Sequence, residues 1–243
     1  MNDLSKAESI DVEVYAEPGI GRITVRTAGI LLIFTLIFTA LMAGAYNLTA
    51  PLLAASAKEE KLRMISEVLP RTLYDNELLA DAVWLAPITQ LNTETDTQVF
   101  RARRGNDPIA LVVEFAANDG YSGRIELILA VDANGQMLAQ RVTHHKETPG
   151  LGDYIDPKKD KNKQRPWITQ FNNLGFEDVP MAQWRVRKDG GRFDQMNGAT
   201  ISARAVTNAS RRALEWIVAN KDALFEQTKD SRFTATASEG QKP

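Results

Sequence analysis

The sequence of 243 residues contains no cysteine and only two histidines, His144 and His145. Without thiols, the chain itself cannot ligate an iron–sulfur cluster, attach a c-type haem, form a disulfide or use a thiolate nucleophile. The two histidines are adjacent, and adjacent side chains in a strand point to opposite faces, so a histidine-rich metal centre is not expected. Any redox or group-transfer chemistry would therefore need an organic cofactor.

The sequence also lacks an excess of basic residues. It has 29 Lys and Arg against 31 Asp and Glu, which gives a formal net charge of −2. Residues 1–26 carry three basic and five acidic side chains, and the part after residue 57 is balanced. Nucleic-acid-binding proteins normally carry a basic excess. No nucleic-acid partner is therefore expected.

Charge is absent from the 31 residues between Arg26 and Lys58, and the centre, Ile30 to Tyr46, is almost wholly apolar. A helix needs about 20 apolar residues to cross a bilayer, so residues 27–54 predict a single transmembrane helix. A buried core helix and a cleaved signal peptide are the alternatives. Ala55-Ser-Ala57 resembles a cleavage site, but the long acidic lead before the span is unlike a signal peptide.

The charges on the two sides of this span do not set its orientation. Arg22 and Arg26 precede it, whereas Lys58, Lys61 and Arg63 follow it, so the positive-inside count is nearly balanced. The sequence predicts five parts in chain order. They are an N-terminal lead (1–26), the transmembrane helix (27–54), an amphipathic stalk (55–80), a folded domain (81–227) and a polar, disordered tail (228–243).

The folded part predicts an α+β domain with an antiparallel sheet and packed helices, because strand-like segments precede a long amphipathic helix. We expect strands at 97–103, 109–116, 124–131, 137–145 and 183–188, a short helix at 167–174 and the long helix at 201–225. A Gly-, Pro- and Lys-rich loop spans residues 148–166. Asp132–Gly135 indicates a hairpin turn.

Two glycine-containing segments of this domain suit a ligand. In the first, residues 144–153, Gly150 and Gly152 allow a ligand to approach the backbone closely, although an ordinary strand-ending turn has the same composition. In the second, residues 189–200, small residues precede Thr200 at the start of the long helix. Free N–H groups and the helix dipole there favour an anion such as phosphate. The alternative is that Thr200 is simply an N-cap.

Three stretches together resemble one family. They are Gly120-Tyr-Ser-Gly123, residues 141–153 (Arg-Val-Thr-His-His-Lys-Glu-Thr-Pro-Gly-Leu-Gly-Asp) and residues 188–208, which include Asp-Gln-Met-Asn-Gly-Ala-Thr. In their order, spacing and residue identities, these stretches resemble the G subunit of the Rnf (also called Rsx) electron transport complex. That protein belongs to the FMN-binding domain family, as does the C subunit of the sodium-translocating NADH:quinone reductase. The resemblance extends from the span to about residue 225.

The resemblance implies a covalent flavin. The family pattern is Asp-x-x-Ser/Thr-Gly-Ala-Thr, and its last Thr carries FMN through a phosphoester, which a flavin transferase installs. Thr200 occupies that position and Asp194 is the Asp of the pattern, while Gly198 and Ala199 belong to the recognised sequence. Asn197 departs from the usual Ser or Thr, although Asn can still form hydrogen bonds. The resemblance also implies that Glu147, Thr148, Gly150 and Leu151 line the flavin, with Tyr121 and Ser122 nearby.

The implied function is electron relay by a non-catalytic, membrane-anchored subunit. Family members couple electron flow to ion translocation or keep a redox sensor reduced, and they work with other membrane subunits in a bacterial inner membrane, with the flavin domain on the periplasmic side. Two alternatives stay open. One is the quinone-reductase subunit with the same cofactor, and the other is an anchored binding module without flavin.

Overall fold

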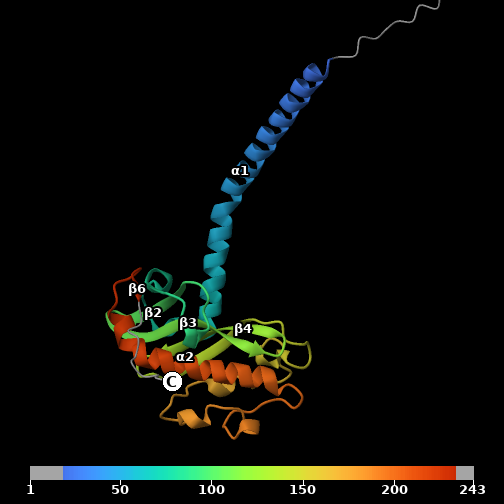
Figure 1. Cartoon of the computed structure of the whole chain (residues 1–243). Coiled ribbons are helices and arrows are strands. Elements are labelled where there is room, and N and C mark those ends of the chain that lie inside the picture. Colours follow the sequence, from blue (N-terminus) through green and yellow to red (C-terminus); the bar gives the residue numbers. More distant parts are fainter. Residues whose placement is uncertain (1–18, 234–243) are drawn as a thin grey trace, which may run out of the picture. The chain divides into compact units, whose positions relative to one another are not determined.

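The computed structural model describes residues 19–233, and the chain divides into two compact units, residues 1–57 and 58–243. The helix α1 (Ile20–Ser66) begins in the first unit and ends in the second (Figure 1). It starts before the predicted span and ends well before residue 80, the predicted end of the stalk. Residues 1–18 of the predicted lead lie outside the described residues.

The part of α1 in the first unit has the composition of a membrane span. Its most apolar 18-residue window has a mean hydropathy of 2.3, and none of that window is buried. Large side chains such as Leu31, Phe34 and Phe38 are more than half exposed. This exposure does not fit a core helix of a water-soluble protein. By length and composition, the helix can cross a bilayer.

The second unit is built on a six-stranded sheet. The strands are β1 (Ala82–Leu85), β2 (Thr97–Arg104), β3 (Asp107–Gly120), β4 (Gly123–Asp132), β5 (Met137–His144) and β6 (Arg232–Phe233), in the spatial order β5-β4-β3-β2-β1-β6. β1 to β5 pair with their chain neighbours in antiparallel fashion, while β6 pairs parallel to β1. The sheet is therefore mixed, whereas we expected an antiparallel one, and β1 and β6 were not predicted.

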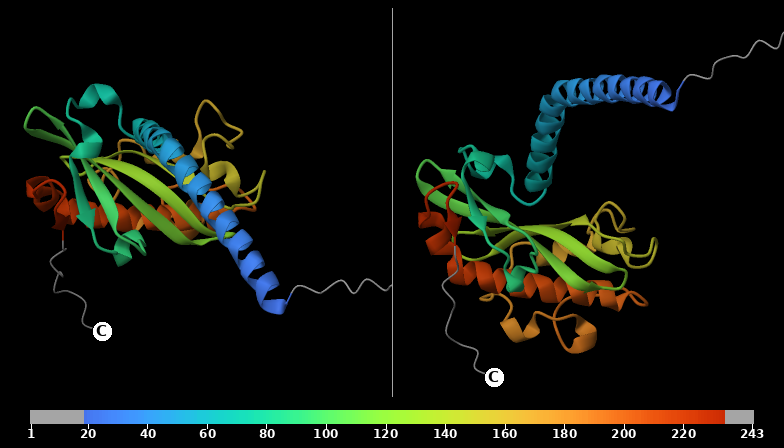
Figure 2. Two further views of the ribbon diagram at one scale, coloured as in Figure 1. Left: turned by 90° about the horizontal axis from the view of Figure 1, so that it is seen from above. Right: turned by 45° about the horizontal axis from the view of Figure 1, so that its top comes forward.

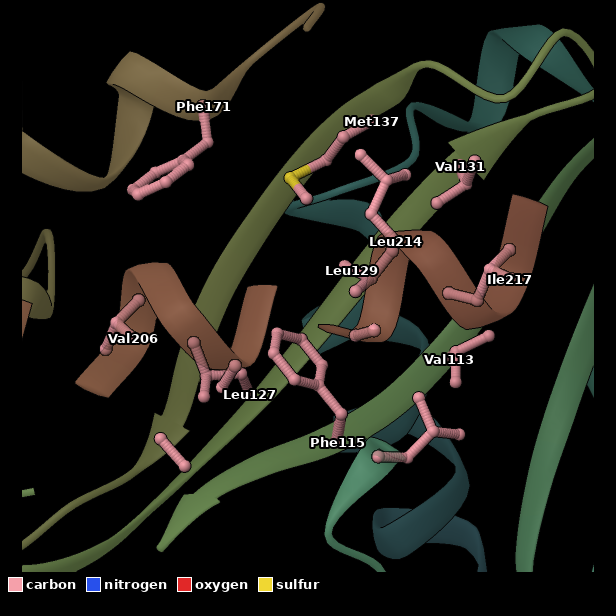
Figure 3. Packing of buried hydrophobic residues seen from close by; sticks show 14 of the residues in the cluster. Val113, Phe115, Leu127, Leu129, Val131, Met137, Phe171, Val206, Leu214 and Ile217 are labelled. Atoms are coloured by element: carbon pink, nitrogen blue, oxygen red, sulfur yellow. The ribbon is translucent and has the colours of Figure 1, made fainter. Parts of the chain in front are cut away.

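One face of the sheet is covered by α2 (Thr200–Glu226), which runs across it in both sets of views (Figures 1 and 2). Because side chains alternate along a strand, Val113 and Phe115 of β3 point to this face. They meet Leu214 and Ile217 of α2 in the main hydrophobic core, where all four are at most 3% exposed (Figure 3). The predicted apolar stripe of the long helix is therefore its core-facing side.

The opposite face of the sheet is also buried. Val112 of β3, which alternates with Val113, packs there with Phe100 of β2. Ile65 near the end of α1 and Leu69 cover these side chains, and both are fully buried. Since each long strand is apolar on both faces, the middle of the sheet reads as nearly continuous hydrophobic sequence.

Between β5 and α2 the chain contains only short 3₁₀ helices: Asp153–Ile155, Trp167–Phe171, Met181–Gln183 and Arg187–Asp189. Stacked and edge-on aromatic rings hold this segment together, with Phe171 and Phe193 only 4.3 Å apart between ring centroids. The predicted strand at 183–188 is wrong. Trp184 and Val186 are buried and alternate with exposed residues, which imitates a strand, but Val186 forms only an isolated bridge with Phe193. The helix predicted at 167–174 is the 3₁₀ turn Trp167–Phe171.

A buried arginine closes the far end of α2. The guanidinium of Arg101, on β2, donates to the carbonyls of Leu224 and Gln227, and it pairs with Asp81. Arg101 is only 2% exposed. Carbonyls in the last turn of a helix have no partner within the helix, so this side chain satisfies them and complements the negative end of the helix dipole.

Candidate cofactor-binding site

Antiparallel pairing places three segments of the second unit at one end of the sheet. The turn after β3, the start of β4 and the end of β5 lie together there, because β3–β4 pairing ends at Gly120 and Gly123 and Glu126 of β4 pairs with His144 of β5. The start of α2 reaches the same place. A pocket of about 110 Å³ lies where they meet. It is lined by Tyr121, Glu147, Thr148, Leu151, Gly152, Gly198, Ala199, Ile201 and Ser202.

Glu147 is the polar centre of the pocket. Its side chain is almost fully buried, at 4% exposure. One carboxylate oxygen accepts a hydrogen bond of 3.0 Å from the backbone N–H of Ser122, in the β3–β4 turn. The other oxygen accepts a hydrogen bond from the hydroxyl of Ser202, in the first turn of α2. The carboxylate thus connects the segment after β5, where Glu147 lies, to the β3–β4 turn and to the first turn of α2.

Two glycines leave room for this carboxylate. A Cβ atom at Gly120 would lie 2.9 Å from Oε1 of Glu147, and one at Gly152 would lie 2.8 Å from Oε2. Real Cβ atoms essentially never come this close to another atom. The carboxylate therefore contributes to the need for glycine at both positions. A Cβ at Gly120 would lie still closer to the Gly123 carbonyl. One at Gly152 would lie still closer to the Ser202 hydroxyl, at 2.7 Å.

Thr200 is the first residue of α2 and is partly buried. The N-cap is Ala199, and no side chain caps the helix, so the alternative that Thr200 is simply an N-cap is wrong. The first N–H groups of such a helix lack partners within it and attract anions. A phosphate on the Thr200 hydroxyl would lie at this helix start. The residues present therefore fit a phosphate-linked cofactor.

Tyr154 fixes the backbone that leads to Thr200. Its hydroxyl donates to the carbonyl of Ala199 at 3.2 Å and accepts the N–H of Met196 at 3.1 Å. Burial raises the pKa of Tyr154 to about 12, so the phenol keeps its proton at any physiological pH. Sequence reasoning missed this residue, although it directly follows the glycine-containing segment 144–153.

The structure places Asp194 away from the pocket. Its backbone carbonyl accepts a hydrogen bond of 2.6 Å from Nε1 of Trp167, and its backbone N–H donates to Gln170. The exposed carboxylate pairs with Arg187 at 3.0 Å. It borders a second hollow of about 380 Å³. Neither the pocket nor this hollow is lined by the exposed residue Asn197.

Of the eleven site residues predicted from sequence, the structure brings six into the lining of the pocket: Tyr121, Glu147, Thr148, Leu151, Gly198 and Ala199. Ser122 contributes its backbone N–H to Glu147, and Gly150 donates its own N–H to Asp153 at 2.9 Å. Thr200 lies between two lining residues, Ala199 and Ile201. The lining residues Gly152, Ile201 and Ser202 were not among the predicted site residues.

Comparisons with known proteins cover both units. Residues 120–215 match the FMN-binding domain family, and residues 20–68 match the RnfG N-terminal region. The G subunit of the ion-translocating oxidoreductase complex from Pseudoalteromonas atlantica is 36% identical over 211 residues, which are 87% of this chain and 95% of the relative. The G subunit from Shewanella loihica is 34% identical over 206 residues, 85% of this chain and 95% of the relative.

The same protein from Vibrio cholerae is 37% identical over 198 residues, which are 82% of this chain and 92% of the relative. The match to the RnfG N-terminal region favours the Rnf family over the quinone-reductase alternative. With its apolar N-terminal helix, its FMN-binding domain and relatives that it covers almost from end to end, the chain belongs to the RnfG family, the G subunits of ion-translocating oxidoreductase complexes.

Proposed function

We propose that the protein relays electrons through an FMN that is attached by a phosphoester to the hydroxyl of Thr200. The observation that carries the proposal is the position of Thr200, at an uncapped helix start beside the pocket of the FMN-binding domain. When bound, FMN supplies one- and two-electron redox chemistry, and the protein supplies binding, orientation and electrostatics.

The pocket supports a tethered cofactor. Pockets that enclose a small ligand usually have about 300–1,000 Å³, whereas this one has about 110 Å³. A covalent bond retains a cofactor that the pocket covers only in part. Tyr121, Leu151 and Ile201 line the pocket and are each at least 42% exposed, so they offer apolar surface to a flavin ring.

A flavin edge that the pocket leaves uncovered is accessible for electron transfer to another protein. We infer that neighbouring subunits of the complex are the partners, with electron flow coupled to ion translocation or to the reduction of a redox sensor. In this proposal the protein relays electrons and has no acid or base of its own. A flavin transferase recognises the stretch from Asp194 to Thr200, which is mostly exposed or partly buried. Residues 27–54 span the bacterial inner membrane once, and the flavin domain is periplasmic.

The experiment is to co-express the full chain with a flavin transferase and to measure flavin fluorescence in a denaturing gel together with the intact mass. The wild-type chain and Thr200→Ser should carry one FMN adduct, and Thr200→Ala should carry none. The exposed Thr95 provides a matched control, since Thr95→Ala should keep the adduct. A fluorescent Thr200→Ala protein would overturn the attachment site. An unmodified wild-type chain beside an active transferase would support the binding module without flavin.

The topology has a separate test. Protease added to spheroplasts should degrade the flavin domain of a periplasmic protein while the inner membrane is intact. Full protection of the domain until the membrane is broken would show the opposite orientation.

A further inference from the structure

Glu147 is buried, carries a carboxylate and connects two distant segments of the pocket. Attachment of a flavin to Thr200 does not by itself require such a residue. Each of the two carboxylate oxygens of Glu147 accepts one hydrogen bond, from the Ser122 N–H and from the Ser202 hydroxyl. An ionised carboxylate can only accept hydrogen bonds, and each of its oxygens has a donor here. Within residues 19–233, the structure records no ion pair for this carboxylate.

The basic residues next to Glu147 in the sequence form no ion pair with its carboxylate. The imidazole of His145 contacts the backbone of Glu147, whose N–H donates to Nδ1 at 3.1 Å, and not its carboxylate. Lys146 is exposed, and the structure shows no contact between it and the carboxylate. Among residues 19–233, this buried carboxylate therefore has hydrogen-bond donors but no ion-pair partner, and it lies in the wall of the pocket. Charges act strongly at such sites, because little water screens them.

We propose that Glu147 is a positioning residue with a second effect on the cofactor: it joins the β3–β4 turn to the first turn of α2, and its charge lowers the reduction potential of the bound flavin. The proposal rests on the proposed function, because it requires a flavin in this pocket. The physical reason is simple. Reduction adds electrons to the flavin, and a fixed negative charge in the pocket wall opposes added negative charge.

Two substitutions of Glu147 separate the effect of its charge from the effect of its length. Glu147→Gln keeps the length and can still accept hydrogen bonds, but it removes the charge. Glu147→Asp keeps the charge, but it is one methylene shorter and cannot bridge Ser122 and Ser202 in the same way. Glu177 provides a matched control, since it is exposed and borders a different hollow from the pocket.

The experiment uses the full chain co-expressed with a flavin transferase, and it measures flavin content by intact mass and the midpoint potential by spectroelectrochemical titration. Glu147→Gln should keep most of its flavin and shift the equilibrium toward reduced flavin by about tenfold or more, about 30 mV for a two-electron couple. Glu177→Gln should leave the potential unchanged. Glu147→Asp should lose flavin content or thermal stability, with a potential closer to that of the wild type.

An unchanged potential in a folded, flavin-containing Glu147→Gln protein would overturn the effect of the charge. If that variant does not fold, Ser202 tests the same contact from the other side. Ser202→Ala should lower the flavin content, whereas Ser202→Thr, which keeps the hydroxyl, should retain it. Equal content in both would overturn the positioning role. Absence of flavin from the wild-type chain would instead refute the proposed function, so the two failures are distinguishable.

Discussion

The phenol of Tyr154 and the backbone carbonyl of Ala199 are joined by a hydrogen bond of 3.2 Å, although the two residues are 45 positions apart in the sequence. The same hydroxyl accepts the N–H of Met196. This side chain therefore determines the path of the backbone in the last turn before Thr200. A covalent cofactor at Thr200 would depend on that path, because the transferase must find the hydroxyl accessible.

The first prediction concerns this pair of contacts. Tyr154→Phe keeps the ring but leaves the buried Ala199 carbonyl and the Met196 N–H without their partner, which costs about 1–3 kcal/mol in the free energy of unfolding. Flavin content after co-expression should fall. Tyr46→Phe is the control, because Tyr46 lies outside the pocket, is 69% exposed and makes no hydrogen bond through its hydroxyl to the described residues. Urea unfolding and intact mass measure the two effects, and equal values for the two variants would contradict the role of Tyr154.

The second prediction is a loss of stability at high pH. The pKa of Tyr154 is raised by burial from 10.0 to about 12 in the folded protein, so the folded state holds the proton more tightly than the unfolded state. The associated stability is complete below pH 10 and is lost as the pH rises toward 12. It amounts to about 2–3 kcal/mol. Urea unfolding at several pH values should show a steeper decline for the wild type than for Tyr154→Phe, and parallel curves would refute the assignment.

The third prediction concerns the C-terminal end of α2. Arg101→Met has a similar size but leaves the carbonyls of Leu224 and Gln227 and the carboxylate of Asp81 without this donor. We expect the free energy of unfolding, measured in urea, to fall by about 3 kcal/mol, because the carbonyls at the helix end lose their donor and Asp81 keeps only one arginine partner, Arg103 at 3.0 Å. Arg232→Met is the matched control. It breaks an exposed pair with Asp96, and such pairs contribute about 0–1 kcal/mol.

The fourth prediction concerns the room left for Glu147. In Gly152→Ala, the new Cβ would lie 2.7 Å from Oγ of Ser202, so the hydrogen bond between Ser202 and Glu147 must shift. We expect lower flavin content and lower thermal stability. Gly44→Ala adds the same methyl group where nothing lies within 4 Å, and it should behave like the wild type. Normal flavin content in Gly152→Ala would show that the pocket tolerates this displacement.

Local signals were enough to predict the long elements. The charge-free stretch predicted the apolar helix. Alternation predicted β2 and β4, β-rich composition predicted β3, and the turn signal at Asp132–Gly135 placed β5 after it. The helical spacing of Ala209, Ala213 and Ile217 predicted α2 with its buried side. The segment between β5 and α2 could not be predicted in this way. Its structure depends on contacts between distant rings, such as Phe171 with Phe193, and alternation around Trp184 imitates a strand that has no neighbour for pairing.

In the site, too, local sequence predicted some features, whereas others depend on contacts between distant residues. The sequence motifs identified the segments around Glu147 and Thr200, and the fold brings these segments to one end of the sheet. The roles of Ser202 and Tyr154 depend on contacts across 55 and 45 residues, and no local pattern carries that information. Asp194 lies outside the pocket because its backbone is held by Trp167 and Gln170. In the proposed function, Asp194 would therefore serve recognition by the transferase and would not contact the flavin.

The two edge strands of the sheet affect how copies of the domain can associate when they are close together in a membrane. A protein that is confined to a membrane plane meets its copies at high local density, and long free strand edges would let them join into larger sheets. On one side, the outermost described strand, β6, pairs through only two residues, Arg232 and Phe233. On the other side, Leu174 bridges to Met137 of β5. A two-residue strand on one side and a bridge at the start of β5 on the other therefore shorten the free edges through which copies of this domain could pair.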